Sequence, residues 1–522
     1  MHRIRTQEGG FDMYTVRFQL ELNSSEKRFL SKSFFYANRM HNQIVRHTTS
    51  RLNALFHDKE YMEARKAYGE AEFSKKKGSE LSASEKKKKK ELSDIMNNKQ
   101  KEYGLVKGAL YKFVSIEQKK FKNYINFHQA QAEAEAVYKG VEKILFEDGR
   151  HLHYRRYNSF DCIKQKCATT GVRLPRWDTI CFMKHYYKVR IPEDEYIQNI
   201  ITSVDLKKDV VYSFLKRIEF NSGFKYYVVI TLRGDAPKRI KLSKDGGHRT
   251  GVDFGTSTIA TVSNNEVHLE ELAPESAKYE KEIRHKQNLV DASMRKHNPE
   301  NYNKNGTVKK GKHKWKTTKR CRRLKRQIRV LYRKQSAYIK TSHHTFINRV
   351  VQNASEFILE PMNFKALQKK SKKTERQDEA VSVKQKDGSS KMVRKYKRKK
   401  RYGHSIRNRS PGLMQADLKS KAIQYGIPYY EIDIHQYRAS QLHHDTGEYI
   451  KPALSERFKT IEGHRVQRDL YSAFLIYHTD DTLTAPDFET CHLDFPHFVK
   501  MQDTLILNMK KCGHTMKSCF GF

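Results

Sequence analysis

The stretch Gly-Val-Asp-Phe-Gly-Thr-Ser-Thr-Ile-Ala-Thr-Val, residues 251–262, decides the fold of the second half of this chain. Apolar and β-branched residues flank a glycine-containing bend, so the stretch predicts a strand, a turn and a second strand. Asp253 lies inside the first strand, where an ionised carboxylate is costly unless it is paired or bound to a metal ion. Gly251 and Gly255 would let backbone or a polyanion come close to it. The bend also offers two hydroxyl donors, those of Thr256 and Ser257.

Two further acids stand in comparable settings. Glu360 ends the apolar stretch Phe357-Ile-Leu, and Asp469 opens the apolar stretch Leu470–Ile476. Taken alone, such acids are more often turn residues, surface acids at strand ends, or acids that interact with the dipole at a helix start. Taken together, their order and settings predict a site of three carboxylates. Such a site could hold two divalent cations against a phosphodiester.

The charge of the chain points to a polyanionic partner. Its 522 residues, enough for about three domains, include 103 Lys and Arg against 59 Asp and Glu, a formal net charge of +44. Self-repulsion of this size opposes compaction unless a polyanion offsets it, so we expect nucleic-acid binding. A solvated basic surface is the alternative. Binding to a membrane surface is disfavoured, because a long amphipathic lysine-rich helix is absent from the sequence.

The apolar segments and the cysteines indicate the compartment. We find no stretch near the ~18 apolar residues of a membrane span, and no apolar segment follows the basic N-terminus. The 7 cysteines are odd in number and scattered, which suits a reducing environment rather than a disulfide framework. We therefore expect a cytoplasmic protein without a membrane partner.

The first 245 residues read as a β-module interrupted by helices. Met13–Leu22 alternates apolar and polar residues and predicts a strand. Asn23 and Glu26 have the spacing of a capping box, which would open a helix, and a charged helical texture continues to about Glu147. In residues 210–232, β-branched and aromatic residues flank a short Gly-containing turn, which predicts a hairpin.

The second half continues with alternating helices and strands. We expect a helix over Arg320–Asn353 with basic residues on one face, a short strand over Glu356–Leu359, a helix over Gly412–Gln424 and a strand over Tyr425–Ile434. Lys365–Arg401 is a basic low-complexity segment that we expect to be disordered without a partner.

Three segments resemble the RuvC-I, RuvC-II and RuvC-III motifs of the TnpB (OrfB) transposon-associated nucleases and the related type V CRISPR effector nucleases. They are Gly251-Val-Asp-Phe-Gly255, Phe357-Ile-Leu-Glu360 and Val466-Gln-Arg-Asp469. The resemblance extends to further segments and covers about residues 205 to 475. These are Leu331–Lys340, Glu360–Leu367, Tyr437-Arg-Ala-Ser440 and Leu454-Ser-Glu-Arg457.

The resemblance implies an α/β plus α+β multidomain chain, with an RNase H-like (RuvC) nuclease domain and an N-terminal β-barrel-like wedge module interrupted by a helical recognition domain. The expected boundaries are 1–23 for the first strand of the wedge module, 24–147 for the recognition domain, 148–245 for the β-rich part of the wedge module, 246–438 for the first part of the nuclease domain, 439–465 for an insert that replaces the zinc ribbon and binds target nucleic acid, and 466–522 for the end of the nuclease domain and the C-terminal tail.

The function that the resemblance implies is RNA-guided, metal-dependent cleavage of DNA next to a short DNA motif. Asp253, Glu360 and Asp469 would be the catalytic residues, holding two Mg²⁺ or Mn²⁺ ions about 4 Å apart. The partners would be a guide RNA and double-stranded target DNA with its displaced single strand. We expect a monomer in the prokaryotic cytoplasm, associated with the nucleoid.

A guide–target duplex is held through its phosphates by many lysines and arginines, with aromatic residues for stacking. We expect such contacts from two basic segments of the second half. The residues are Lys314, Trp315, Lys316, Arg320, Arg323, Lys325, Arg326, Lys369, Lys370, Lys397, Arg398 and Arg401.

The chain departs from the family pattern in two places. The family's paired Cys-x-x-Cys zinc ligands are missing, because residues 440–464 contain no cysteine. Four residues there could bind a metal, but their spacing is not that of a thiolate site, so we predict no zinc and an insert that folds on its own packing. They are His443, His444, Asp445 and His464. The second departure is Tyr471, which stands where the family has a supporting Asn.

Other interpretations stay open at this point. Cys512, His514 and Cys519 offer at most three metal ligands, and we expect a packed or idle tail. A guided DNA-binding repressor that has lost cleavage would share the fold, although all three acids are present here. A DNA-joining transposase with an RNase H-like fold is the third reading, because three acids alone do not separate strand transfer from hydrolysis.

Overall fold

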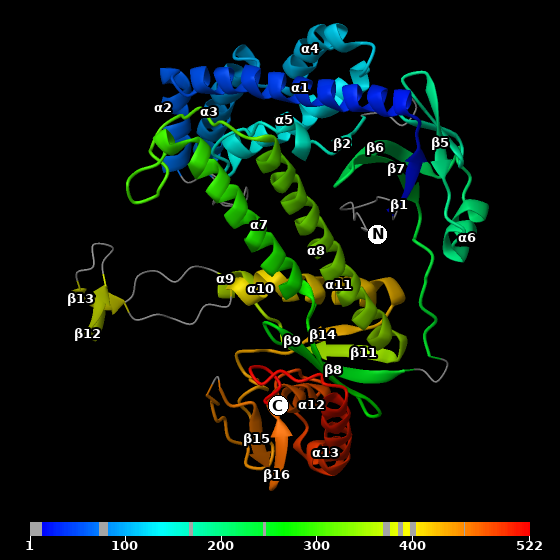
Figure 1. The fold of residues 1–522 in the computed structure, drawn as a ribbon, viewed down its shortest axis with the longest axis vertical. Helices are drawn as coiled ribbons and strands as arrows, with labels where there is room; N and C mark the ends of the chain where they lie inside the picture. Colours follow the sequence, from blue (N-terminus) through cyan, green and yellow to red (C-terminus); the bar gives the residue numbers. More distant parts are fainter. Residues whose placement is uncertain are drawn as a thin grey trace. The chain divides into compact units, whose positions relative to one another are not determined.

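The computed structural model describes residues 13–71, 82–165, 171–243, 247–368, 376–384, 390–396, 403–453 and 455–522. The chain divides into two compact units, Met1–Pro237 and Lys238–Phe522 (Figure 1). Each unit combines helices with β-sheet, so the expectation of a mixed α/β, multidomain chain is confirmed at this level. Within the described ranges, none of the helices has the length and apolar character needed to cross a membrane.

The first unit is built on a seven-stranded antiparallel sheet, and the N-terminal strand β1 stands in its middle. The predicted hairpin is confirmed as β6 and β7, which pair along their whole length. In spatial order the strands are β2 (Cys162–Ile163), β6 (Val210–Phe220), β7 (Gly223–Arg233), β1 (Met13–Glu21), β5 (His185–Arg190), β4 (Thr179–Phe182) and β3 (Arg173–Arg176).

The helices of the first unit lie almost entirely between β1 and β2 in sequence. The predicted capping box opens the first of them, because Glu26 N donates to Asn23 Oδ1 at 2.9 Å and Asn23 N donates to Glu26 Oε2 at 2.8 Å. The helices are α1 (Ser24–Leu55), α2 (Lys59–Glu70), α3 (Ala83–Glu102), α4 (Lys107–Gln118), α5 (Phe127–Phe146) and α6 (Glu195–Ser203), with 3₁₀ turns η2 (Lys119–Phe121) and η3 (Tyr157–Ser159). Apolar residues of α1, α4 and α5 share one core with the sheet.

The second unit is built on a five-stranded mixed sheet. Its spatial order is β10 (Val267–Glu271), β9 (Thr258–Val262), β8 (His248–Phe254), β11 (Ala354–Leu359) and β14 (Tyr429–Glu431). β8, β9 and β10 run antiparallel, whereas β8, β11 and β14 run parallel to one another. The carboxyl ends of the three parallel strands therefore meet at one edge of the sheet.

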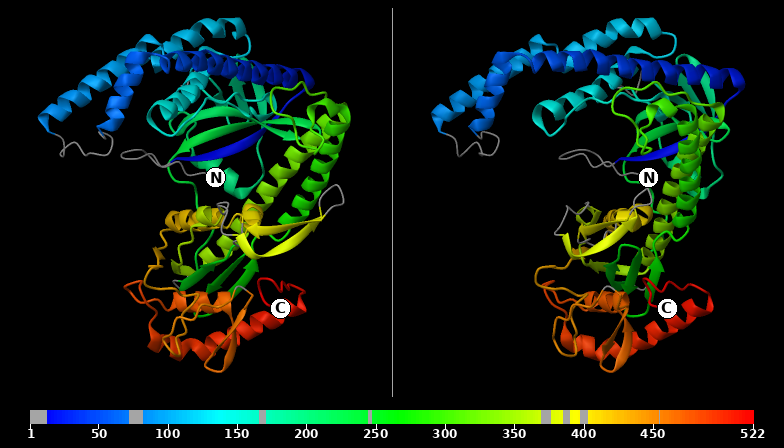
Figure 2. Two further views of the ribbon diagram at one scale, coloured as in Figure 1. Left: turned by 90° about the vertical axis from the view of Figure 1, so that its left-hand side faces the viewer. Right: turned by 60° about the vertical axis from the view of Figure 1, so that its left-hand side comes forward.

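Helices cover both faces of this sheet (Figures 1 and 2). On one face, α12 (Arg468–Tyr477) and α13 (Phe488–Lys511) form a core with Ala260, Val262 and Ile358. On the other face, α8 (Lys319–Gln352) and α11 (Pro411–Tyr425) pack on residues such as Val252 and Phe357. The central strands are near-continuous apolar runs because both of their faces are buried. The remaining elements are α7 (Ser276–His297), η4 (Pro299–Asn301), α9 (Phe364–Gln368), α10 (Gly403–Arg409), β15 (Phe458–Ile461) and β16 (His464–Gln467).

Two sequence-based expectations are corrected in this unit. Residues 376–384 and 390–396 form the strands β12 (Arg376–Lys384) and β13 (Ser390–Tyr396), so the expectation of disorder is wrong for them. Valines alternate with other residues in β12 and favour a strand there. The many lysines of the segment had suggested low complexity instead. The strand expected over Tyr425–Ile434 is confined to β14, because Tyr425 still belongs to α11 and Gly426 ends that helix at φ +74°.

Gly251 is the point at which α12 contacts the backbone of β8. A Cβ at this position would lie 2.3 Å from the carbonyl oxygen of Ala473 and 2.4 Å from the backbone nitrogen of Tyr477. The absent side chain thus makes room for a helix of the same unit, and not for the polyanion that the sequence suggested. Because α12 also carries Asp469, this contact fixes how near that acid lies to β8.

Replacing Gly251 with alanine should destabilise the second unit. The new methyl group would meet helix backbone, which cannot rotate away, so we expect Gly251→Ala to lower the free energy of unfolding by about 1–3 kcal/mol or more. Denaturant unfolding of the purified chain measures this. Gly108→Ala is the matched control, since it lies in α4 with no atom within 4 Å of the added Cβ, and alanine there should be neutral or slightly stabilising. Equal stability of the two variants would contradict the proposed close contact.

Candidate active site

Two of the three acids stand at the ends of neighbouring parallel strands. Val252 of β8 pairs with Leu359 of β11, so the next residue along each strand is Asp253 and Glu360 respectively. Val252 and Leu359 are buried in the core beneath, while the two acids are only partly buried. The parallel register therefore brings both carboxylates to the same edge of the sheet.

The third acid, Asp469, lies in the first turn of α12 and its residue is 8% exposed. Gln467 caps this helix, its side chain accepting a hydrogen bond from Leu470 N at 2.8 Å. Thr258 Oγ1 donates to Asp469 Oδ2 at 3.3 Å, and Arg468 Nη2 lies 3.3 Å from Asp469 Oδ1. The start of the helix, a hydroxyl and a guanidinium thus hold the orientation of this carboxylate.

The other two acids act electrostatically on Asp253. Burial raises the pKa of Asp253 well above its usual range, and the charges of Asp469 and Glu360 raise it further, while the positive charge of Arg468 opposes the shift. Burial alone raises the pKa of Glu360. The site therefore concentrates more negative charge than its own cation neutralises, which is the condition under which carboxylates bind a metal ion.

The grouping of the three acids limits the metal sites that they could form. Across the described residues, the three carboxylates do not form a group whose oxygens all lie within 4.8 Å of one another. One ion bound by all three acids would need a tighter cluster. Two divalent ions about 4 Å apart are held by a wider set of oxygens, with phosphate oxygens of a substrate completing the coordination. Asp253 is the acid whose pKa is raised by the charges of both other carboxylates.

The hydroxyl donor at this site is not one of the two expected from the sequence. Ser257 Oγ contacts Cys519 Sγ at 3.2 Å, and the Thr256 carbonyl accepts a hydrogen bond from Ser405. Thr258, the next residue, reaches Asp469 instead. A Cβ on Gly255 would lie 2.6 Å from Thr258 Oγ1, so this glycine leaves space for that hydroxyl. Arg468 lies inside the Val466–Asp469 motif and Thr258 inside the stretch 251–262, and these positions are the signal that could have found them.

Tyr471 points away from the acids. It follows Asp469 by two residues, which rotates its side chain about 200° around the helix. The side chain is fully buried, and its hydroxyl oxygen lies 3.0 Å from the backbone N of His444, which donates to it, and 2.8 Å from His444 Nδ1. This residue therefore holds the insert that follows β14, and it does not take over a function at the carboxylates.

The expected nucleic-acid contacts of the first basic segment lie before and at the start of α8, which packs antiparallel to α7. All but Lys325, which is half-buried, have exposed side chains, and Trp315 stacks edge-on against Tyr302. Within the described part of the chain, Lys314, Arg320 and Arg323 have no carboxylate within 4.0 Å. The other exposed members of this group are Lys316 and Arg326.

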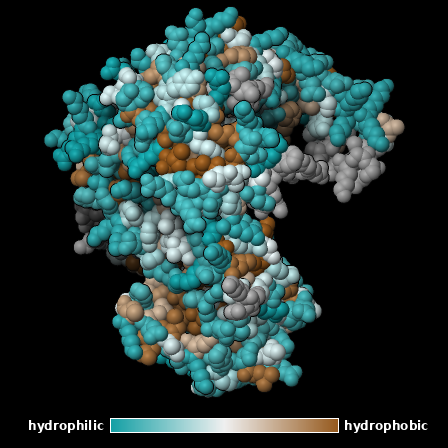
Figure 3. Space-filling model, turned by 90° about the vertical axis from the view of Figure 1, so that its right-hand side faces the viewer, coloured by the Kyte–Doolittle hydropathy of each residue, from teal (hydrophilic) through white to brown (hydrophobic). Residues whose placement is uncertain are grey.

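All five contacts predicted in the second basic segment lie outside the described residues. The contacts predicted there are Lys369, Lys370, Lys397, Arg398 and Arg401. Hydrophilic side chains cover most of the face shown in Figure 3, with smaller apolar patches between them. This face is therefore compatible with a polar or charged ligand, whereas these five positions remain predictions.

Comparisons with known proteins give only distant similarities. Neither a family model nor a curated protein matches the chain. Among solved structures, the chain is similar to a protein in the cryo-EM structure of a Cas12f1–sgRNA–target DNA complex, with 11% identity and a TM-score of 0.40 over 89% of this chain and 98% of that one. A CRISPR-Cas12f ternary complex gives 12% identity and a TM-score of 0.25 over 89% and 83%. Because both TM-scores lie below 0.5, these similarities do not assign a function.

The raised pKa of Asp253 predicts how stability depends on pH in the absence of divalent metal. The folded state holds this proton more tightly than the unfolded chain does, so the stabilising contribution is complete below the unfolded pKa of about 3.9 and is lost as the pH rises through the folded pKa. Asp253→Asn removes the charge. We therefore expect it to have a higher melting temperature than the wild type at pH 7 in EDTA, by a margin that shrinks toward pH 4.

Thermal unfolding between pH 4 and pH 8 measures this difference. Asp481→Asn is the control, because Asp481 is an exposed acid of the same unit, and its substitution should leave the pH profile unchanged. An Asp253→Asn variant that is less stable than the wild type at pH 7 without metal would contradict the raised pKa. Saturating Mg²⁺ should reverse the order, since an ion at 100 times its Kd stabilises the wild type by about 2.7 kcal/mol.

Proposed function

We propose that this chain is an RNA-guided, metal-dependent DNA endonuclease whose second unit contains an RNase H-like, RuvC-like nuclease domain. The observation that carries the proposal is the meeting of three acids from three distant segments at one edge of a mixed sheet. Asp253 and Glu360 come from parallel strands, and Asp469 comes from the helix packed on them. In a chain of net charge +44, such a concentration of negative charge is explained by bound cations and a phosphodiester.

The residues of the site would have two roles, metal binding and the orientation of a metal-binding carboxylate. Asp253, whose pKa both other acids raise, would contact both ions, while Glu360 and Asp469 would each hold one side of the pair. Thr258 and Arg468 each contact one oxygen of the Asp469 carboxylate and keep it in place. When bound, Mg²⁺ or Mn²⁺ ions supply an activated water and stabilise the leaving oxygen in an in-line displacement.

The arrangement of the first unit supports the proposed wedge and recognition modules. β1 pairs with β5 and β7, although more than a hundred residues separate them, and helices α1 to α5 fill the interval. A β-module interrupted by a helical domain is what the resemblance implies for residues 1–23, 24–147 and 148–245. We propose that these modules bind the guide RNA and the target duplex through shape and phosphates, in a monomer of the prokaryotic cytoplasm.

Loss of Asp253 should abolish cleavage without loss of nucleic-acid binding. Removing a ligand shared by two ions forfeits several kcal/mol of transition-state stabilisation, so we expect Asp253→Ala to cut DNA at least about 10³-fold more slowly. The protein is purified with the small RNAs that bind it, and these RNAs are sequenced. Cleavage of a plasmid that matches the guide RNA is then measured in Mg²⁺ and in EDTA. Asp481→Ala is the control and should cleave normally.

Each alternative gives a different result in this experiment. Undiminished cleavage by Asp253→Ala would contradict the site assignment. Guided binding by the wild type without Mg²⁺-dependent cleavage would favour a cleavage-deficient repressor. Joined products with transposon ends in place of hydrolysed ends would favour a transposase. If no structured RNA is enriched, the proposal that an RNA guides the protein is contradicted. The nuclease site would then be tested by Mg²⁺-dependent cleavage of DNA without a guide.

Arg320 and Arg323 should contribute to nucleic-acid affinity through phosphates. The double variant Arg320→Ala/Arg323→Ala should bind more weakly at all sequences, and the slope of log K against log[salt] should fall by about 0.7–0.9 for each phosphate that is no longer neutralised. Fluorescence anisotropy at several salt concentrations measures this slope. Lys500→Ala/Lys511→Ala, which removes the same charge from exposed positions of α13, is the matched control. An equal change in slope for both variants would indicate a general charge effect only.

A further inference from the structure

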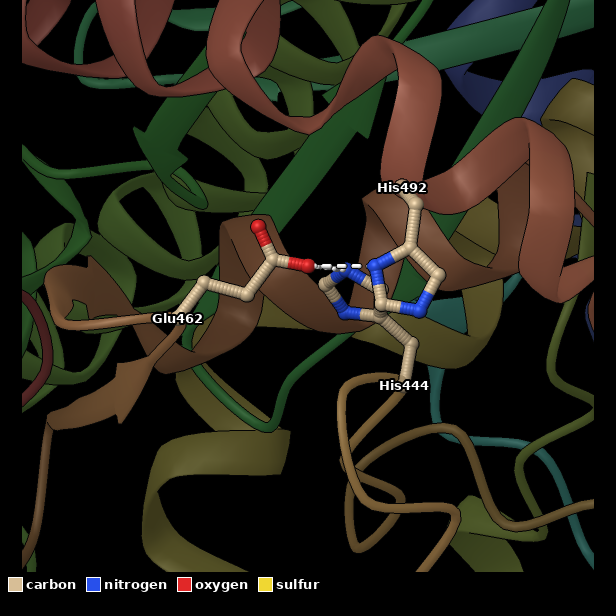
Figure 4. A group of neighbouring side chains, drawn as sticks. All are labelled: His444, Glu462 and His492. Atoms are coloured by element: carbon tan, nitrogen blue, oxygen red, sulfur yellow. Dashed lines mark hydrogen bonds and ion pairs between the residues drawn. The ribbon is translucent and has the colours of Figure 1, made fainter.

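A second group of potential metal ligands lies outside the three acids. His444 follows β14 in the cysteine-free insert, Glu462 stands at the tip of the β15–β16 hairpin, and His492 belongs to the second turn of α13 (Figure 4). His444 Nε2 lies 3.3 Å from Glu462 Oε1, and His492 Nδ1 lies 2.5 Å from the same oxygen. Over the ranges that the structure describes, this is the one set of His, Cys, Asp and Glu whose ligand atoms all lie within 4.8 Å of one another.

The buried imidazole of His444 is oriented as metal-bound histidines are. Its side chain is 0% exposed, and its Nδ1 lies 2.8 Å from the hydroxyl of Tyr471. Its Nε2 is buried and makes no well-aligned hydrogen bond, although it is aimed at the Glu462 carboxylate and at His492. A buried nitrogen of this kind needs a partner. When Nδ1–H donates to Tyr471, the lone pair of Nε2 faces the group, which is the tautomer that a ligating histidine requires.

Glu462 occupies a strained position that directs its carboxylate toward both imidazoles. Its φ is +47°, and Gly463 follows at +76° in a two-residue turn. Asn or Asp is the usual residue at the first of these positions, whereas glutamate gains no local hydrogen bond there. Its backbone N donates to Asp445 Oδ2 at 3.2 Å, which ties the turn to the residue after His444. Strain that is held in place by neighbours points to a function for the side chain.

We propose that His444 Nε2, the Glu462 carboxylate and His492 Nδ1 bind one divalent transition-metal ion of the zinc class. Two imidazoles and a carboxylate are a typical zinc set, whereas Mg²⁺ and Ca²⁺ prefer oxygen ligands alone. The side chains of Glu462 and His492 are 29% and 48% exposed, so water takes the fourth position. The ion joins the insert, the hairpin and α13, and it is distinct from the ions proposed at the three acids.

The distances between the three side chains allow one zinc ion to bind with little rearrangement. Tetrahedral ligands about 2.0–2.1 Å from zinc are about 3.3–3.4 Å apart, which is the separation already found between His444 Nε2 and Glu462 Oε1. The shorter His492–Glu462 contact has to open by roughly 0.8–0.9 Å. His492 is the most exposed of the three, so its side chain has room to move. This proposal replaces the sequence-based prediction of no zinc, because His492 lies outside the insert whose residues that prediction considered.

Zinc binding by the full-length protein tests the proposal. The protein is stripped with EDTA, exchanged into buffer with excess Mg²⁺, and titrated with Zn²⁺ against a chromophoric chelator, while melting temperature is followed in parallel. We expect one Zn²⁺ per chain and a higher melting temperature. His492→Ala and Glu462→Gln change exposed side chains and should fold, but should weaken this binding at least about 100-fold, beyond the effect of losing a mere orienting residue.

Two control variants make the result specific. His464→Ala removes an exposed imidazole from the same hairpin, outside the group, and should bind Zn²⁺ as the wild type does. Asp253→Ala should also bind it normally, so that failure of the nuclease proposal and failure of this one are separate results. Absence of the bound ion in the wild type, or Zn²⁺ affinity unchanged in both His492→Ala and Glu462→Gln, would overturn the site.

Discussion

The contact between helix α12 and strand β8 is the constraint on which the second unit depends. Every residue of this helix from Asp469 to Ile476 is buried, so the helix has to lie inside the fold rather than on it. At Gly251 it comes so near the strand that a single methyl group would collide with its backbone. This approach sets the position of Asp469 against Asp253. The geometry of the acids is therefore a consequence of core packing, not of the loops around them.

The packing of α12 on β8 brings carboxylates close together, although burial and mutual repulsion disfavour their charged forms. The pKa of Asp253 is raised by burial and by its two acidic neighbours, and only Arg468 opposes the shift. The carboxylate of Asp469 is stabilised by its place at the helix start, by Thr258 and by the same arginine. Conflicts of this kind between stability and local chemistry are concentrated at functional sites, because selection tolerates the loss of stability only where it serves a purpose. An ion that binds there would relieve the repulsion and stabilise the fold together.

The sequence predicted the features that local patterns encode. The capping box at Asn23, the strands around Asp253 and the helix that Asp469 opens are each written in a few neighbouring residues, and each is present. Contacts between distant segments were not predictable in this way. The donor to Asp469 is Thr258 and not its neighbours, because the direction of one side chain in a bend depends on the helix that packs against it. Likewise, His492 lies far in sequence from the insert that it approaches.

The two departures from the family pattern are physically connected. The chain lacks the cysteines of a zinc ribbon and has Tyr471 in place of an Asn, and the structure shows that the tyrosine hydroxyl contacts both the backbone and the imidazole of His444. The side chain of Tyr471 does not contact the acids and instead anchors the insert. An insert without thiolate ligands needs another source of order, and a buried hydroxyl reaching from α12 supplies one. The same helix therefore places one residue at the acids and, from its opposite side, organises the segment in which the family keeps its metal.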